Sequence, residues 1–433
     1  MCDAPLPRMK RAYDFGPLGG EDAAWLHMED ETNPMVVTGL LELDGPIDDA
    51  SLLSLLERGL ASRPRFRARV VEPAFGVGVP HWEPDPDFAL SRHVERITLE
   101  DDAALRAFVG RQAGTLLDRG RPLWRTWAID GPARGTTLLF RIHHAIADGF
   151  ALMATLLSLC DEHAPEKARA ETHGSTIGGV LRQAASLGRL VALPPDPRTA
   201  LKRPLTRDKR VAWSDPVPLE RVKDAAHAFS ATVNDVLVSA VAGALRRHLV
   251  TRGEDVAQVR AMVPVNLRAG SDVPTLDNRF GLVILALPVG VADPVERLRE
   301  TKRRMDHLKA SPEAIVAMGV LRALGWAPTK VEDLGVTFFG MKTSLVLTNV
   351  PGPRETLHLA GIPIRKLVFW VPQSARMGVG ISIFSYAGAV SLGVLTDASV
   401  LADPNELVAG LTAELDALLA RAPSSSERTR PHA

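Results

Sequence analysis

Residues 136–150, TTLLFRIHHAIADGF, combine a strand-like run, a pair of histidines and an Asp-Gly step. The apolar and β-branched residues of 136–144 are typical of a buried strand, and leucines recur at helical spacing in the segment that follows, 149–164. We therefore expect His143 and His144 at the end of a strand, just before a helix. The Asp-Gly step is expected at the turn that joins this strand to the helix.

Strand-like and helical segments alternate along the rest of the chain as well. Strand-like runs occur at 35–43, 66–71, 136–144, 259–268, 280–290, 344–352, 366–372 and 380–397. Helical periodicity occurs at 49–61, 149–164, 218–230, 232–250 and 404–422. No repeat with a period of about 20 to 50 residues is present. The pattern predicts two α/β halves of similar size.

A change in composition separates these halves between residues 174 and 213. The segment starts with an amphipathic helical pattern and continues through LPPDP into a basic run. It has eight Lys or Arg residues against two acidic residues, a net charge of +6. We interpret 174–213 as a basic, amphipathic linker between an N-terminal domain, 1–173, and a C-terminal domain, 214–422, followed by a polar tail, 423–433.

The composition excludes several classes of protein. The 433 residues are 46% hydrophobic and 24% charged, which is typical of a globular protein with ample core. Lys plus Arg equals Asp plus Glu at 51 each, so no overall field attracts nucleic acid. Cys2 and Cys160 alone cannot build a disulfide framework or a zinc site. The N-terminus resembles no signal peptide and every apolar run falls short of the roughly 20 residues of a membrane span, so we expect a cytoplasmic protein.

The histidine pair has three interpretations. A neutral imidazole, with a pKa of about 6.5, can take a proton from an alcohol or thiol and return it to a leaving group. Asp148 can orient that ring or brace the turn through an arginine, and we favour the brace because Gly149 marks a tight turn. The alternatives are two structural histidines and a metal half-site. The metal is disfavoured because no further histidine cluster or H-E-x-x-H occurs nearby.

Missing motifs narrow the reaction class. The chain contains no G-x-S-x-G, no G-x-x-x-x-G-K-[ST] and no G-x-G-x-x-G between a strand and a helix. Serine-hydrolase, P-loop and dinucleotide chemistry are therefore disfavoured. A direct transfer that uses one histidine base and no covalent enzyme intermediate is the reaction class that remains.

HHAIADG matches the HHxxxDG motif of the chloramphenicol-acetyltransferase-like acyltransferases, and the chain resembles their bacterial wax ester synthase/acyl-CoA:diacylglycerol acyltransferase family. The similarity runs in order over nearly the whole chain, through 18–43, 117–125, 232–240, 263–268, 278–288 and 348–353. HHxxxDG alone also occurs in peptide-synthetase condensation domains, so the further motifs carry the resemblance.

The resemblance implies an α/β fold of two chloramphenicol-acetyltransferase-like domains, each a mixed sheet packed with helices, with the active site in a tunnel between them. It implies acyl transfer from acyl-CoA, as co-substrate and with no cofactor or metal, to a fatty alcohol or to diacylglycerol. His144 would be the general base, and His143 and Asp148 would shape the site. Arg268 in VPVNLR is the predicted partner that braces Asp148.

Other positions are carried over from the family motifs as site-shaping or oxyanion candidates. Thr348 and Asn349 stand where the family has Ser-Asn, and threonine keeps the hydroxyl that an oxyanion requires. For Asn349 the alternative is a strand followed by a proline turn. Asn234 and Gly149 are further candidates, whereas Asp235 is expected to cap the helix that begins after Thr232.

The PLW motif, Pro122, Leu123 and Trp124, is expected to pack in the core or to line an acyl tunnel. The chain departs from the family at Asp277, where glycine is common, which puts a role for the adjacent Asn278 in doubt.

Two alternative functions stay open at this point: a condensation-type acyltransferase that uses a carrier-protein thioester, and a non-catalytic lipid-binding protein on the same fold. A second expectation for location is a peripheral contact of the linker with the inner membrane face or with lipid droplets. Arg203, Arg207, Lys209 and Arg210 are the cations whose neutralisation tests it, and the alternative is a packed helix with a solvated basic loop.

Overall fold

The computed structural model describes residues 15–73, 78–131, 133–162, 188, 192–266, 280–309 and 329–421. It contains one six-stranded sheet, one seven-stranded sheet and a small three-stranded sheet. The small sheet has the order β1 (Gly16–Pro17), β4 (His81–Pro84) and β3 (Ala68–Val71). The fold is α/β with mixed sheets, as the sequence predicts.

The six-stranded sheet carries the histidine motif. Its order is β13 (His358–Leu359), β14 (Ile362–Trp370), β2 (Val36–Leu43), β7 (Thr137–His143), β6 (Trp124–Asp130) and β5 (Val94–Thr98). All neighbours pair antiparallel except β5 with β6. The start of β2 lies beside the end of β7, where Val36 is opposite His143.

Helices cover both faces of this sheet because its strands are apolar on both sides. Helices α2 (Asp49–Leu56) and α4 (Gly149–Leu157) supply leucines to the core on one face. Helix α3 (Asp102–Ala113) packs on the other face, against Trp127 and Leu139. The predicted strand 136–144 and the helix after it are thus confirmed.

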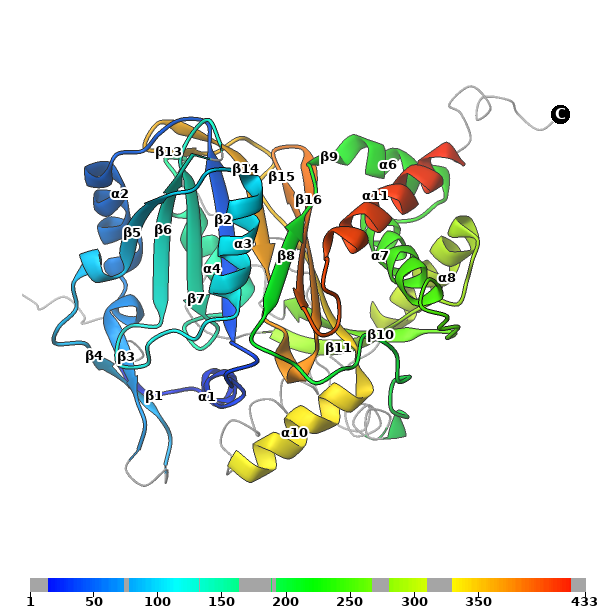
Figure 1. The fold of residues 1–433 in the computed structure, drawn as a ribbon, viewed down its shortest axis with the longest axis horizontal. Coiled ribbons are helices and arrows are strands. Elements are labelled where there is room, and N and C mark those ends of the chain that lie inside the picture. Colours follow the sequence, from blue (N-terminus) through cyan, green and yellow to red (C-terminus); the bar gives the residue numbers. More distant parts are fainter. Residues whose placement is uncertain are drawn as a thin grey trace, which may run out of the picture.

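The seven-stranded sheet belongs mainly to the second half of the chain. Its order is β11 (Phe280–Leu287), β10 (Val259–Asn266), β12 (Leu345–Pro351), β15 (Val379–Tyr386), β16 (Ala389–Asp397) and β8 (Lys209–Trp213), and β9 (Val217–Pro218) also pairs with β16. One face is covered by α6 (Leu219–Ala228), α7 (Val233–Val250), α8 (Pro294–Lys309) and α11 (Asn405–Ala420), on the right in Figure 1.

The opposite face of the seven-stranded sheet is turned toward the first half. Along β12, Leu345 and Leu347 belong to the core under the helices, while the alternate residue Val346 packs with Met262 of β10 on the other face. Farther along, Val350 packs against the core of the six-stranded sheet. The period of two in each strand therefore separates a helix-covered face from a face between the halves.

The two sheets do not follow the boundaries expected from composition. Strand β14, from the C-terminal half, pairs with β2 of the first sheet, and the last residues of the predicted linker, Lys209–Trp213, form β8 of the second sheet. In Figure 1, α3 lies between β2 and β8. A Cβ atom on Gly114, the C-cap residue of α3, would come within 2.2 Å of the Arg207 carbonyl oxygen, so the glycine permits this close approach.

Helix α7 begins as the sequence predicts. The Thr232 hydroxyl accepts the Asp235 N–H at 3.2 Å, and the Asp235 carboxylate accepts the Thr232 N–H at 2.9 Å. This capping box satisfies backbone donors at the start of the helix, so Asp235 is structural. Among the described residues no single helix is long and apolar enough to cross a membrane; α6 and α7 pass that test only as a pair bent by 95°.

Candidate active site

The histidine motif begins where β7 ends, and backbone hydrogen bonds fix it to its neighbours. The His143 N–H donates to the Leu123 carbonyl at 2.9 Å, and the His144 N–H donates to the Met35 carbonyl at 2.8 Å. A turn at residues 144–146 follows, closed by the Ile146 N–H, which donates to the His143 carbonyl at 3.0 Å. The two histidines therefore sit on a backbone that is held from both sides.

The ring of His143 is directed into the protein. The side chain is fully buried, and its Nδ1 accepts the Ala145 N–H at 3.0 Å. That contact leaves the ring proton on Nε2, which lies 3.3 Å from Oε1 of Glu29. At 3.3 Å, this contact is slightly longer than a typical N–H···O hydrogen bond. Both ring nitrogens of His143 thus face protein groups.

His144 has a different environment. His144 is 8% exposed, whereas His143 is 0% exposed. The imidazole stacks on the indole of Trp25, with ring centroids 4.1 Å apart and planes 23° apart. Trp25 lies in α1 (Gly20–His27), which leads into the loop that carries Glu29. Stacking of this kind fixes the plane of the histidine ring.

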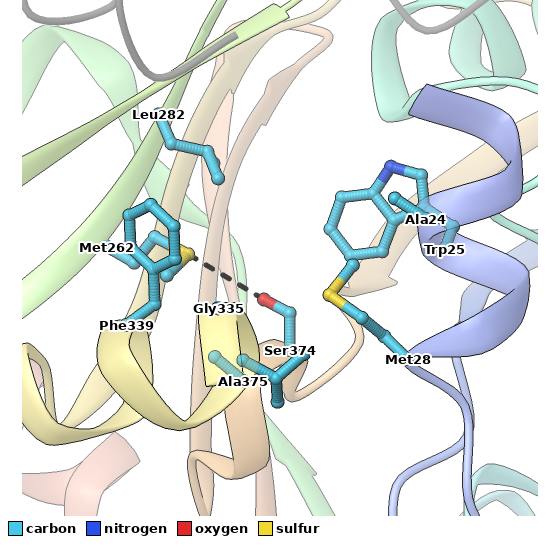
Figure 2. A pocket seen from close by; sticks show the side chains of 10 residues that line it. Ala24, Trp25, Met28, Met262, Leu282, Gly335, Phe339, Ser374 and Ala375 are labelled. Atoms are coloured by element: carbon cyan, nitrogen blue, oxygen red, sulfur yellow. Dashed lines mark hydrogen bonds between the residues drawn. The ribbon is translucent and has the colours of Figure 1, made fainter. Parts of the chain in front are cut away.

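An apolar cavity lies against the same tryptophan. It is a small cavity, with a volume of about 20 Å³, that opens to solvent, and its wall combines α1 with elements of the second half. Figure 2 shows its lining residues, which are Ala24, Trp25, Met28, Met262, Leu282, Gly335, Val336, Phe339, Ser374 and Ala375. The last five lie on α10 (Thr329–Lys342) and on the turn η5 (Ser374–Arg376). Trp25 thus connects His144 to an apolar cavity between the two halves.

Asp148 acts as the N-cap of α4. Its Oδ1 accepts the Ala151 N–H at 2.9 Å, and the residue is 1% exposed. Gly149 is the first residue of the helix, so the Asp-Gly step marks a helix start after the turn. The predicted partner Arg268 lies outside the described residues, as do Asp277 and Asn278, so the brace stays a prediction.

A second contact holds the motif loop from outside. Arg65, on the turn η2 (Pro64–Arg67), donates to the Ile146 carbonyl at 2.9 Å and to Asp22 Oδ2 at 3.1 Å. Because Asp22 lies on α1, the guanidinium joins the helix that carries Trp25 to the loop that carries His144.

The oxyanion candidates lie on different faces of β12. Thr348 is buried and shares the face of Val346 and Val350, which is turned toward the first half. Asn349 lies on the opposite face, where its Nδ2 donates to Oδ1 of Asn234 at 2.7 Å. Asn349 and Asn234 therefore tie the start of α7 to the sheet, and Thr348 has the position that faces the first half.

The PLW residues pack in the core of the first half. Pro122, Leu123 and Trp124 are buried, and the Trp124 indole N–H donates to the Phe66 carbonyl at 2.8 Å. The Trp124 ring stacks on His93 with centroids 4.5 Å apart. None of the three lines the cavity formed by the described residues, so packing is the role that this geometry supports.

Glu29 and Trp25 are site residues that sequence patterns did not single out. Trp25 occurs in an apolar helical stretch and Glu29 in a run of three acids, neither of which indicates a contact with a motif more than a hundred positions away. Burial raises the pKa of the Glu29 carboxyl, but His143, the Met35 N–H and Arg119 outweigh it and hold that pKa below its usual value. The described residues contain no group of three or more His, Cys, Asp or Glu side chains suited to a metal.

Comparisons with known proteins show which family the chain resembles. Residues 18–191 match the model of the wax ester synthase/diacylglycerol acyltransferase catalytic domain, and residues 276–419 match that of the WS/DGAT C-terminal domain. The probable diacylglycerol O-acyltransferase tgs1 of Mycobacterium tuberculosis strain H37Rv is 29% identical over 432 residues, covering 90% of this chain and 93% of that protein.

Solved structures show the same fold. The wax ester synthase/diacylglycerol acyltransferase from Marinobacter aquaeolei VT8 superposes with a TM-score of 0.72 at 24% identity, over 94% of this chain and 99% of that one. The first condensation domain of the CDA synthetase superposes with a TM-score of 0.63 at 18% identity, over 94% and 97% of the two chains.

Proposed function

The chain belongs to the wax ester synthase/diacylglycerol acyltransferase family and is an acyltransferase, and from this premise we propose that it acylates diacylglycerol or a fatty alcohol with acyl-CoA, using His144 as the general base. The observation that carries the proposal is the difference between the two histidines. The His143 ring is fully buried beside Glu29, whereas the His144 ring stacks on Trp25, which lines an apolar cavity.

The reaction needs one proton to be moved twice. His144 takes the proton of the acceptor hydroxyl as the oxygen attacks the thioester carbonyl. The tetrahedral oxyanion collapses, the carbon–sulfur bond breaks, and the coenzyme A thiolate leaves with the proton returned from His144. Stacking on Trp25 supports this role because it holds the ring in one orientation.

Three further observations support the proposed reaction. The Thr348 hydroxyl is a candidate donor to the oxyanion, since its strand face is turned toward the first half, and Asn349 is less suited because it bonds Asn234. The cavity lining of Met, Leu, Phe and Trp side chains is suited to an alkyl chain. The mycobacterial relative is named as a probable diacylglycerol O-acyltransferase, which supports diacylglycerol as one acceptor.

The experiment that tests this function follows release of free thiol from palmitoyl-CoA. The protein and its His144→Ala variant are each given diacylglycerol, hexadecanol or no acceptor, and the lipid products are separated. We expect acceptor-dependent release that falls by about 10²- to 10⁴-fold in the variant. Equal release by both proteins would exclude His144 as the base. Activity only with a carrier-protein thioester would identify a condensation-type enzyme, and acyl binding without turnover would identify a lipid-binding protein.

We further propose that the enzyme acts at an anionic lipid surface, where its acceptor and products collect. Arg203, Arg207 and Arg210 are exposed and close in sequence, whereas Lys209 is buried and is excluded from the set. Replacing the three arginines by glutamine should reduce co-sedimentation with phosphatidylglycerol vesicles and leave activity on dispersed substrate unchanged. Unchanged co-sedimentation would refute the proposal.

A further inference from the structure

We propose that Glu29 is a positioning residue for the acyl transfer, and that it holds both histidines of the motif through one oxygen atom. The inference rests on the proposed role of His144 as the base. Glu29 lies more than a hundred residues from the motif in sequence, and its side chain is only 2% exposed. A buried carboxylate is costly unless specific partners compensate it, so its partners indicate what it does.

Oε1 of Glu29 has two contacts. It accepts the Met35 N–H at 3.0 Å, and it lies 3.3 Å from Nε2 of His143. Because Nδ1 of His143 accepts the Ala145 N–H, the proton on Nε2 points toward the carboxylate. Glu29 therefore favours the tautomer in which Nδ1 of His143 can accept the N–H of Ala145, the second residue of the turn.

The same oxygen acts on His144 through the backbone. Met35, whose N–H donates to Glu29, also has the carbonyl that accepts the His144 N–H at 2.8 Å, so two consecutive peptide units joined at the Met35 Cα make these contacts. Glu29 thereby holds Met35 through its N–H, and Met35 holds the backbone of His144 through its carbonyl. One carboxylate oxygen thus fixes the side chain of the first histidine and the backbone of the second.

The other carboxylate oxygen connects to the helix that supports the His144 ring. Arg119 donates to Oε2 of Glu29 at 3.3 Å and to the Leu26 carbonyl of α1 at 2.8 Å. Leu26 follows Trp25, on which the His144 imidazole stacks. Glu29 and Arg119 therefore couple the backbone of the base to the surface on which its ring lies.

Two substitutions separate this role from general stability. Glu29→Gln keeps an oxygen that can replace Oε1 but places an amide NH₂ opposite Arg119, whereas Glu29→Ala removes both oxygens. We expect kcat of Glu29→Ala to fall by about 10- to 100-fold, since small misplacements of a base have effects of this size. Glu29→Gln should keep kcat within about threefold of the parent, since a neutral acceptor bonds roughly half as strongly as a charged one.

The matched control is Glu42→Gln at the far end of β2. Glu42 is also a nearly buried carboxylate paired with an arginine, Arg365, at 2.9 Å. It lies near Thr137, at the opposite end of β7 from His143. Any loss of stability from removing a buried charge of this sheet appears in both variants, but only Glu29 is joined to the histidines.

The assay measures kcat, KM for palmitoyl-CoA, KM for the acceptor, and the melting temperature of each variant. A lower kcat in Glu29→Ala at unchanged KM, with rescue in Glu29→Gln and normal kcat in Glu42→Gln, is the expected result. Parent-like kcat in Glu29→Ala, or equal losses in both Glu29 variants, would overturn the inference. His144→Ala is run in parallel: if it is inactive while Glu29→Ala is normal, only the positioning role fails, and if it is active the proposed base fails.

Discussion

Replacing Lys209 by methionine should destabilise the second half of the protein far more than a typical change in a basic surface loop. The Lys209 ammonium lies 2.8 Å from Oδ2 of Asp397, and the two side chains are 1% and 0% exposed. Methionine keeps the aliphatic stem and removes the charge. The substitution leaves a buried carboxylate without its cation.

The size of the expected loss in stability depends on the hydrogen bonds that Asp397 keeps. Breaking a buried ion pair costs about 3–5 kcal/mol. The carboxylate keeps the N–H and hydroxyl of Thr206, at 2.7 and 3.0 Å, and the N–H and hydroxyl of Ser399, at 2.9 and 2.6 Å. These four donors place the expected loss at the lower end, about 3 kcal/mol.

The loss of stability in the Lys209→Met variant should depend on pH, and the pKa of Asp397 determines its direction. Burial raises the pKa of Asp397, but Lys209, Ser399 and Thr206 more than offset it, so the pKa lies below its usual value. A carboxyl of this kind stabilises the fold above its unfolded pKa of about 3.9 and loses that contribution as the pH falls through the folded pKa. Without Lys209, burial is opposed by fewer favourable contacts, so the pKa of Asp397 in the folded protein rises. In the variant, Asp397 is therefore protonated at a higher pH than in the parent, which removes the cost of the unpaired buried charge. The difference in the free energy of unfolding between parent and variant then narrows from pH 7 toward pH 4.

The assay combines thermal unfolding at pH 7 and pH 5 with hydrogen exchange of the peptide that contains β8. A loss of about 3 kcal/mol corresponds to a fall of roughly 6–12 °C in Tm for a unit the size of the C-terminal half. Arg210→Met is the control, since its partner Asp208 lies at 2.8 Å but both side chains are more than half exposed, so we expect less than about 1 kcal/mol. Equal Tm values for the two variants, or a difference that does not change with pH, would refute the reasoning.

Three further predictions follow from single contacts. Trp25→Ala should lower kcat/KM by about 10- to 100-fold, measured by thiol release, because the His144 ring loses its support. Gly114→Val should lower the Tm by an amount equivalent to about 1–3 kcal/mol, because its Cβ would meet the fixed carbonyl oxygen of Arg207. Cys160 should resist iodoacetamide at pH 8 and react after unfolding in urea, as followed by mass spectrometry, because burial raises its thiol pKa to about 12.

Local patterns predicted the elements that carry the motif because each depends on neighbouring residues. The strand 136–144 and the helix after it correspond to β7 and α4, and the N-cap pattern at Thr232 is formed as expected. Glu29 is different: its role requires β2 and β7 to pair in the register that sets Val36 opposite His143. No periodicity within either segment specifies that register, so this part of the site needed the structure.

The net charge of the linker does not indicate which of its cations are buried. Its basic run favours a solvated or membrane-facing segment, yet Lys209 pairs with a buried carboxylate inside the second sheet. The partner, Asp397, is distant in sequence and belongs to the far end of β16, opposite Lys209 in register. A count of charges along the chain cannot distinguish a cation that faces water from one that meets a buried acid.

The two adjacent histidines have identical chemistry in the sequence and acquire different roles only because β7 ends between them. His143 still belongs to the strand, so pairing with β2 directs its ring into the core, where Glu29 and the Ala145 N–H occupy its nitrogens. His144 is the first residue of the turn, and its ring stacks on Trp25, which lines the cavity. One residue more or less in the strand would exchange these environments. The register of β7 against β2 therefore determines the environment of each histidine, and under the proposed mechanism residues that stabilise this register position the base without contacting the substrate.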